Sequence, residues 1–593
     1  MAKDRKTIED KFKWNLEEMY SGSKNIESDL KYIKKNIEEI KNYKGKLSDS
    51  ADNLYIVMKL MEECSRKLSH YYVYTHMKHH EDTRINENLG EATKSEMLST
   101  DLDKATSYVV PEILEMDEKK LDEYLKEKRL LKYRKMIDEI LRDKPYILSE
   151  KEEQIMAQVS DLTGVPENAY EMLSYADMKF PEITDEEGNK VELNHFNYNK
   201  FIKSADRRVR KEAFEAEFGT YKKYSNTFAA TLFGAIKAEI FNANIRKYPS
   251  ALYASLFADN INIEVYENLI TSVSENIPAL NKYLNVKKKY LGLDKMHMYD
   301  LYQPMAKDFK MEISYEKAQE IIINALEPIG SEYQDLIKKA FSQGWIDVYE
   351  NEGKKGGAYS WGSYDSHPYI LMSYNNDLNS MFTLIHELGH SIHSYYSRNN
   401  QEYIYSSYKI FVAEVASTVN ETLLIKYLLK NSTSREEKIY LLNYYLEQFR
   451  TTVYRQTLFA EFEKICHEKV EKGQPMTAMD FSKVYFELNQ KYYGGACEVD
   501  QISEVEWARI PHFYSNFYVY KYATGFSAAS VLSSLILDSR ENVDRYIEFL
   551  KSGGSEYPLD QLKKAGIDMS KKDAVDNALK EFAKLVDELD SII

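Results

Sequence analysis

The chain has 593 residues, of which 43% are hydrophobic and 29% are charged, and its formal net charge is −16 at pH 7. This length allows about four domain-sized units with large buried cores, and the acidic balance argues against nucleic acid as a partner, because binding to phosphates needs clustered cations. Residues 1–10 contain no apolar segment for secretion and no long apolar run follows, so we expect a cytoplasmic protein that does not span a membrane.

The N-terminal part of the chain is expected to be helical. Residues 1 to about 110 are charged and amphipathic with very few Gly or Pro, a pattern typical of antiparallel helices. Farther along, Phe180–Leu193 has the composition of a β-hairpin with a turn at Gly188 and Asn189. This hairpin is a natural boundary between an N-terminal helical part and the rest of the chain.

Two stretches near the middle of the chain are rich in β-forming residues. Residues 356–361 and 368–374 are separated by turn residues, so we expect them to form the main sheet of an otherwise helical chain. An exposed strand edge can bind an extended peptide through main-chain hydrogen bonds, with little dependence on side chains. From the residues alone, a structural hairpin that covers the following helix is an equal alternative.

The stretch from Met381 to His393 is predicted to be an amphipathic helix. Apolar residues recur there at helical spacing and form one continuous stripe, which consists of Phe382, Ile385, Gly389, Ile392 and Tyr396. Asp377 or Asn379 can cap the start of this helix. Glycine is unfavourable inside a helix, and we expect Gly389 to leave room for a substrate backbone.

This predicted helix contains the pattern H-E-x-x-H, which is typical of a hydrolytic zinc site. His386 and His390 lie one turn apart on a helix, so both imidazoles can bind one ion, while Glu387 lies beside them. His393 is roughly 10.5 Å from His386 along the axis and is too far away to share that ion, so we expect a hydrogen-bonding or solvated role for it. The third ligand must come from another part of the chain.

A carboxylate on a second helix is the expected third ligand. Glu414 lies in the largely apolar run Lys409–Glu421, where an isolated carboxylate would be costly to bury and a metal ion would be a suitable partner. The residues after His390 are enough to end one helix and to pack a second helix against it. Ser417 and Glu421 follow on the same face and can orient a ligand histidine, although an ordinary surface position explains Glu421 nearly as well.

A tyrosine-rich segment later in the chain offers further polar groups. It carries His512, Tyr514, Tyr518, Tyr520 and Tyr522. Their hydrogen-bond donors can stabilise an oxyanion that forms at a metal. From spacing alone, a tyrosine-rich helix that packs on a lid is the better explanation.

Several segments together resemble the thimet oligopeptidase-like family of zinc peptidases, and within it the oligoendopeptidase F branch. Besides the H-E-x-x-H helix and the Glu414 segment, the similar stretches are Asp206–Lys211, Tyr299–Tyr302, Lys355–Ser360, His367–Met372, Arg509–Tyr514 and Phe517–Gly525. The similarity covers most of the chain and is densest from about residue 200 onward. H-E-x-x-H alone occurs in many zinc peptidases, whereas its combination with the Glu414 and His512 segments is far more specific.

The resemblance implies a mainly α-helical, two-lobed fold like that of neurolysin and thimet oligopeptidase, with a small β-sheet beside the active-site helix and a deep substrate channel. It also implies groups that act away from the metal ligands: Gly357, Ala358, Tyr359 and Tyr514 as substrate contacts, and His512 and Tyr520 as catalytic residues. We expect three regions, namely an N-terminal helical region (1–110), a helical segment that ends in a β-hairpin (111–195) and a catalytic zinc peptidase region (196–593).

These observations predict a zinc-dependent endopeptidase that hydrolyses internal bonds of short unstructured oligopeptides. One Zn²⁺ per chain is expected to be bound by His386, His390 and Glu414, with Glu387 as the general base for a zinc-activated water. Two alternatives stay open: a zinc exopeptidase, acting as a carboxypeptidase or an aminopeptidase, and a peptide-binding protein without turnover. The intact base Glu387 weighs against the second alternative.

Overall fold

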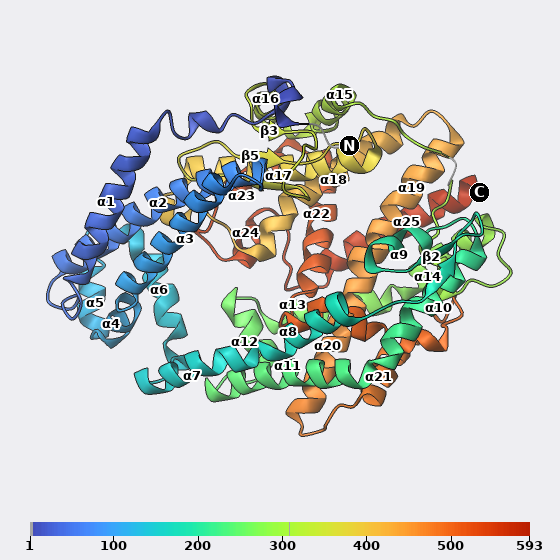
Figure 1. Cartoon of the computed structure of the whole chain (residues 1–593), viewed down its shortest axis with the longest axis horizontal. Coiled ribbons are helices and arrows are strands. Elements are labelled where there is room, and N and C mark those ends of the chain that lie inside the picture. Colours follow the sequence, from blue (N-terminus) through green and yellow to red (C-terminus); the bar gives the residue numbers. More distant parts are fainter. Residues whose placement is uncertain (1–3, 307–308) are drawn as a thin grey trace. The chain divides into compact units, whose positions relative to one another are not determined.

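The computed structural model describes residues 4–306 and 309–593, and most of them are helical (Figure 1). The chain forms two compact units, each built from three segments. Unit 1 consists of Met1–Ile147, Met311–Leu424 and Leu535–Tyr557, and unit 2 consists of Leu148–Lys310, Ile425–Ser534 and Pro558–Ile593. The predicted mainly α-helical class is confirmed. The predicted division into the regions 1–110, 111–195 and 196–593 stays a prediction.

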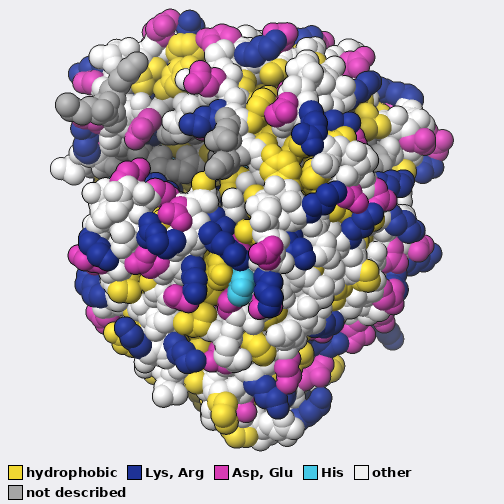
Figure 2. Space-filling view, turned by 90° about the vertical axis from the view of Figure 1, so that its right-hand side faces the viewer, with side chains coloured by type: hydrophobic (Ala, Val, Ile, Leu, Met, Phe, Trp, Pro, Cys, Tyr) yellow, Lys and Arg dark blue, Asp and Glu magenta, His cyan; other side chains and the backbone are white. Residues whose placement is uncertain are grey.

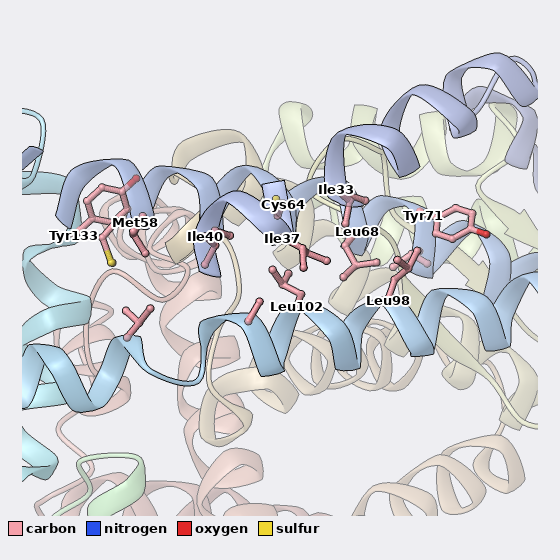
Figure 3. Packing of buried hydrophobic residues seen from close by; sticks show 14 of the residues in the cluster. Ile33, Ile37, Ile40, Met58, Cys64, Leu68, Tyr71, Leu98, Leu102 and Tyr133 are labelled. Carbon is pink, nitrogen blue, oxygen red and sulfur yellow. The ribbon is translucent and has the colours of Figure 1, made fainter. Parts of the chain in front are cut away.

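The first helices of unit 1 share an apolar core. They are α1 (Ser23–Lys41), α2 (Ala51–Glu81), α3 (Asn86–Thr106), α4 (Val109–Glu115), α5 (Glu118–Tyr124) and α6 (Arg134–Asp143). Figure 3 shows the buried side chains of Ile33, Ile37 and Ile40 between α1 and its neighbours. Because these residues are three or four positions apart, they form one stripe on α1. Within the described residues 4–110, the predicted helices are thus confirmed as α1, α2 and α3.

A small sheet packs against helix α17 (Leu378–Asn400) in unit 1. Its strands are β3 (Ile346–Asp347), β4 (Tyr359–Trp361) and β5 (Tyr369–Leu371), in the order β3-β5-β4. Strand β5 is parallel to β3 and antiparallel to β4, with Ser360 opposite Ile370. The two predicted strands are confirmed as β4 and β5, and within the described part of the chain β4 lies at an edge of the sheet.

Further helices of unit 1 enclose the apolar side of α17. They are α15 (Tyr315–Ala325), α16 (Ser331–Ser342) and α23 (Arg540–Lys551), and all three contact α17. Helices α18 (Ile410–Asn431) and α22 (Tyr520–Asp538) contain residues of both units. Helix α17 is therefore held by the sheet and by several helices, which makes it a rigid support for the side chains that it carries.

Unit 2 combines many helices with one hairpin. Its helices include α7 (Glu150–Thr163), α8 (Val165–Glu171), α9 (His195–Phe201), α10 (Arg207–Lys223), α11 (Ser225–Ile245), α12 (Ala251–Ala258), α13 (Ile263–Glu275), α14 (Ile277–Tyr290), α19 (Arg435–Phe449), α20 (Arg455–Glu471), α21 (Ala478–Tyr493), α24 (Pro558–Lys564) and α25 (Asp573–Ile592). Strands β1 (Glu182–Thr184) and β2 (Lys190–Glu192) pair antiparallel. Gly188 in their turn has a φ of +88°, which glycine adopts without strain. The predicted hairpin is confirmed.

The face of the molecule drawn in Figure 2 carries both signs of charge. Lys and Arg side chains are interspersed there with Asp and Glu. Among residues 4–306 and 309–593, no helix combines the length and the hydropathy needed to cross a lipid bilayer.

Candidate metal centre

Helix α17 buries an apolar stripe and carries two histidines outside it. Its start is capped by Asp377, whose carboxylate accepts a 2.7 Å hydrogen bond from the Ser380 amide. The predicted stripe is buried throughout and consists of Phe382, Ile385, Gly389, Ile392 and Tyr396. His386 and His390 remain partly exposed. The hydrophobic pattern therefore fixes which face of the helix carries the histidines.

Gly389 allows α17 and α18 to approach closely. A Cβ at this position would lie 2.5 Å from Ser417 Cα and 2.9 Å from the Ala416 carbonyl oxygen, so a larger residue does not fit. The expectation that Gly389 leaves room for a substrate backbone is wrong, because the backbone of α18 occupies that space. The same close approach brings Glu414, about one turn before Ser417, next to the two histidines.

His386, His390 and Glu414 bring three ligand atoms together. The two histidine Nε2 atoms are 3.1 Å apart, and Glu414 Oε2 lies 3.4 Å from His386 Nε2 and 3.5 Å from His390 Nε2. In a tetrahedral site with metal–ligand bonds of about 2.0–2.1 Å, neighbouring ligand atoms are about 3.3 Å apart. The group therefore fits a zinc ion in both spacing and donor type. Since all three side chains are partly exposed, water can reach the site.

Glu421 orients His386. Its carboxylate lies 2.5 Å from His386 Nδ1, so the imidazole donates from Nδ1 and leaves the Nε2 lone pair for a metal. Burial lowers the pKa of His386, but hydrogen bonds to Glu414 and Glu421 outweigh burial and raise it to about 10. Burial raises the pKa of Glu414, but the two histidines hold it below its usual range, and the Ser417 hydroxyl lies 3.3 Å from its Oε2. The site favours a cation, whether a proton or a metal ion.

Glu387 lies next to the ligand group on the same helix. It is only 7% exposed, and burial raises its pKa, while His386, His390 and a hydrogen bond with the main chain of Ser360 in β4 lower it. A carboxylate with a raised pKa is a stronger base than a solvated one. The position of Glu387 is suitable for proton transfer, and its catalytic role stays a prediction.

The segment before strand β4 has an open main chain. Gly356 and Gly357 are exposed, and no described atom lies within 4 Å of the position that a Cβ would take at either residue. The Tyr359 hydroxyl, by contrast, is 2.7 Å from His80 Nδ1 and is held inside unit 1. The substrate contacts predicted for Gly357, Ala358 and Tyr359 stay predictions. The geometry favours the main chain of Gly357 and Ala358 as the part that would contact a substrate.

His393 lies outside the ligand group, as predicted. It is 1% exposed, and its ring stacks on that of Tyr408 with centroids 3.7 Å apart. Burial lowers its pKa to about 3, with a smaller contribution from His390. The expectation of a solvated role is therefore wrong, and within the described part of the chain its Nδ1 has no hydrogen-bond partner.

The predicted groups of the tyrosine-rich segment belong to unit 2, whereas the ligand group belongs to unit 1. Within unit 2, His512 Nε2 lies 3.3 Å from the Tyr522 hydroxyl. Tyr520 is 1% exposed, and its ring centroid is 5.2 Å from that of Tyr266. The roles predicted for His512 and Tyr520 at the metal stay predictions, because they depend on both units.

Tyr514 is the remaining residue that the sequence analysis selected. Its hydroxyl is 2.7 Å from Thr231 Oγ1, and its ring centroid is 4.5 Å from that of Tyr170. These contacts hold the side chain within unit 2. A contact of Tyr514 with substrate stays a prediction.

Two further tyrosines contact predicted site residues. Tyr522 pairs with His512, and Tyr408 stacks on His393 with its hydroxyl 2.9 Å from Ser394 Oγ. Tyr522 was recognisable as a member of the tyrosine-rich segment. Tyr408 precedes α18 in an irregular stretch, so no periodic pattern marks it.

Comparisons with known proteins agree with this site. A family model described as peptidase family M3 matches residues 200–581, and one described as oligopeptidase F matches residues 112–180. The chain is 45% identical to oligopeptidase PepF of Bacillus subtilis (strain 168) over 592 residues, which cover 100% of this chain and 88% of that protein. It is 38% identical to group B oligopeptidase PepB of Streptococcus agalactiae serotype III (strain NEM316), over 100% and 99% of the two chains.

Solved structures show the same relationship. A protein of Chlamydophila abortus described as a peptidase has a TM-score of 0.94 and 36% identity, with 100% of both chains covered. Oligoendopeptidase-F from Enterococcus faecium has a TM-score of 0.74 and 34% identity, with 96% of this chain and 99% of that chain covered. The chain therefore belongs to peptidase family M3, and it is a metal-dependent peptidase of the oligoendopeptidase F type.

Proposed function

We propose that this enzyme is a zinc endopeptidase that hydrolyses internal bonds of short, unstructured peptides. The observation that carries the proposal is the spacing of His386, His390 and Glu414, which fits a tetrahedral zinc site, together with Glu387 beside them. The names of the relatives support the choice of substrate class, because PepF and PepB are oligopeptidases.

The chain's own groups divide the work of hydrolysis. Zinc, when bound, supplies a Lewis acid for the scissile carbonyl and lowers the pKa of a water molecule. Glu387 accepts a proton from that water and later delivers it to the leaving amine, and its buried position keeps it basic enough for both transfers. Glu421 keeps the Nε2 lone pair of His386 directed at the ligand group.

The peptide substrate lies, in this proposal, along Gly357, which is exposed, and Ala358, which is partly exposed. Extended main chain there can pair with the main chain of a peptide. Such pairing accepts many peptide sequences, because side chains contribute little to it. The edge position of β4 and the exposed glycines support this assignment. We further propose a two-lobed enzyme with a deep substrate channel, which only a flexible chain can enter to reach the metal.

His512 and a tyrosine are proposed to stabilise the oxyanion that forms when the carbonyl is attacked. The resemblance to the thimet oligopeptidase-like family implied Tyr520, but the hydrogen bond between His512 and Tyr522 favours Tyr522 as the partner of His512. Replacing each tyrosine by Phe distinguishes them: a hydroxyl that acts in the transition state lowers kcat about 10²–10³-fold when removed, with little change in KM. If neither variant loses kcat, both tyrosines have packing roles.

Digestion of a peptide that is blocked at both ends tests the reaction class. Internal cleavage, detected by mass spectrometry, identifies an endopeptidase, whereas trimming of an unblocked peptide alone identifies an exopeptidase. Binding without cleavage would identify the peptide-binding alternative. Chelation should abolish cleavage and added Zn²⁺ should restore it, while Glu387→Gln should keep the metal and lose about 10²–10⁴-fold in rate. Near-normal hydrolysis by Glu387→Gln would rule out the assigned base.

A further inference from the structure

Unit 2 contains a cavity that is lined by three arginines and lies outside the predicted metal ligands. Its volume is about 90 Å³, and its charged lining residues are Arg450, Arg455, Arg509 and Glu506. Hydroxyl and amide groups complete the polar wall: Tyr198, Tyr302, Tyr485, Tyr493, Asn199 and Asn489. A polar cavity of this size has room for more than one water-sized group, at roughly 30 Å³ each.

A π-helical turn connects two of the arginines. The π-helix spans Arg450–Tyr454 between α19 and α20, and the Arg455 amide donates to the Arg450 carbonyl. Both arginines line the same cavity. Single π-helical turns are rare and often mark functional sites.

Arg450 has an unused hydrogen-bond donor. It is 0% exposed, and its Nε and Nη2 donate to Glu447 at 2.7 to 3.1 Å. Its Nη1 has no hydrogen-bond partner within the described part of the chain. A buried guanidinium nitrogen without a partner is destabilising, so a group that accepts its hydrogen bond would stabilise the folded chain.

The cations around the cavity outnumber their carboxylate partners. Glu506 pairs with Arg455 at 2.5 Å and Glu217 pairs with Arg509 at 3.0 Å. Glu447, however, is shared, since buried Lys287 lies 3.1 Å from the same carboxylate that pairs with Arg450. The cluster thus keeps an excess of positive charge in a buried place.

From the unused donor, the π-helical turn and the charge excess we propose that this cavity binds one small inorganic anion with the size and charge of chloride. Arg450 Nη1 donates to the anion, and the neighbouring guanidinium of Arg455 supplies further positive charge. An anion satisfies both the buried donor and the charge excess, whereas a water molecule satisfies only the donor.

Thermal unfolding of the full chain tests the proposal. Sodium gluconate is replaced stepwise by sodium chloride at constant ionic strength, because gluconate is too large for the cavity and the ionic strength stays fixed. Specific binding should raise Tm by about 2 °C or more and should saturate. An equal Tm in both salts would overturn the proposal. A rise in Tm with formate or acetate but not with chloride would show that the cavity selects carboxylates. The proposal of an inorganic anion would then be wrong.

Matched variants locate the effect. Arg450→Lys keeps a cation beside Glu447 but removes Nη1, so it should lose most of the chloride-dependent shift. Arg246→Lys is the control, since Arg246 also binds a glutamate, Glu153, at 2.7 and 2.9 Å but does not line the cavity. If Arg450→Lys does not fold, crystals of the unmodified enzyme soaked in bromide decide the question. An anomalous peak next to Arg450 supports the proposal, and water density alone refutes it.

Discussion

Zinc binding by the ligand group depends on the positions of single atoms. Glu414 provides its Oε2 to the group, whereas Glu421 contacts the far side of His386. We therefore expect Glu414→Ala to lose bound zinc and activity together. Glu421→Ala should keep the ligand set but weaken zinc affinity about 10- to 100-fold, because His386 is no longer oriented.

Metal analysis after dialysis against graded zinc buffers measures both effects. Glu332→Ala is a suitable control, since Glu332 contacts Tyr396 of α17 and lies outside the ligand group. Full zinc occupancy in Glu414→Ala would show that another group is the third ligand.

Buried His393 predicts a pH dependence of stability. Its pKa falls from 6.5 to about 3 on folding, so the unfolded chain binds this proton first. The stability that neutral His393 provides is therefore complete above pH 6.5 and is lost as the pH falls toward 3. Between pH 7.5 and pH 5 this group should cost about 2 kcal/mol of the free energy of unfolding.

His393→Phe should remove that loss, because Phe can stack on Tyr408 but does not titrate. Urea unfolding of both proteins at several pH values measures the difference. Protonation of the metal-binding residues affects both proteins equally, so it cancels in the comparison. If the free energy of unfolding changed with pH in the same way in both proteins, His393 would not be the cause of the loss.

At the scale of elements, the contact between α17 and α18 positions the third ligand. Gly389→Ala inserts a methyl group that would lie 2.5 Å from Ser417 Cα, and the neighbouring atoms are backbone that cannot rotate away. We expect a loss of about 1–3 kcal/mol in the free energy of unfolding and a lower zinc affinity, since the helices must separate.

Gly90→Ala provides the matched comparison. Gly90 is also helical but is exposed, with no described atom within 4 Å of an added Cβ. Alanine there should stabilise α3 by up to about 1 kcal/mol, because it favours the helix over the unfolded chain. If Gly389→Ala changed neither the free energy of unfolding nor the zinc affinity, α17 and α18 would tolerate a wider spacing.

At the scale of the whole molecule, the prediction concerns substrate size. A peptide that pairs with the Gly357 segment must be extended, and a folded domain must first unfold at a cost of about 5–15 kcal/mol. We expect efficient cleavage of short unstructured peptides and negligible cleavage of stable domains. One mixture tests this, with the same cleavage sequence in a short peptide, in a long disordered carrier and in a stable domain.

The outcomes of that mixture are distinct. Rapid cleavage of the stable domain would refute a channel restricted to flexible chains. Equal rates for the short peptide and the disordered carrier would show that substrate length is not limited, so the channel would have to be open at both ends.

Features that repeat among neighbouring residues of the chain could be predicted without the structure. The period of the apolar residues placed His386 and His390 outside the buried stripe of α17, and the composition around Gly188 identified a hairpin. The same local reasoning found Glu414, because an acidic residue in an apolar helix needs a partner. These features depend on spacing within a single element, which a linear sequence records directly.

Contacts between elements that are distant in the chain could be identified only from the folded structure. It assigned Gly389 to the contact with α18 rather than to a substrate, buried His393 against Tyr408, and paired His512 with Tyr522. It also gathered Arg450, Arg455 and Arg509 around one cavity. Such contacts depend on how close two elements pack and how their side chains are turned, and no spacing within one element encodes that distance.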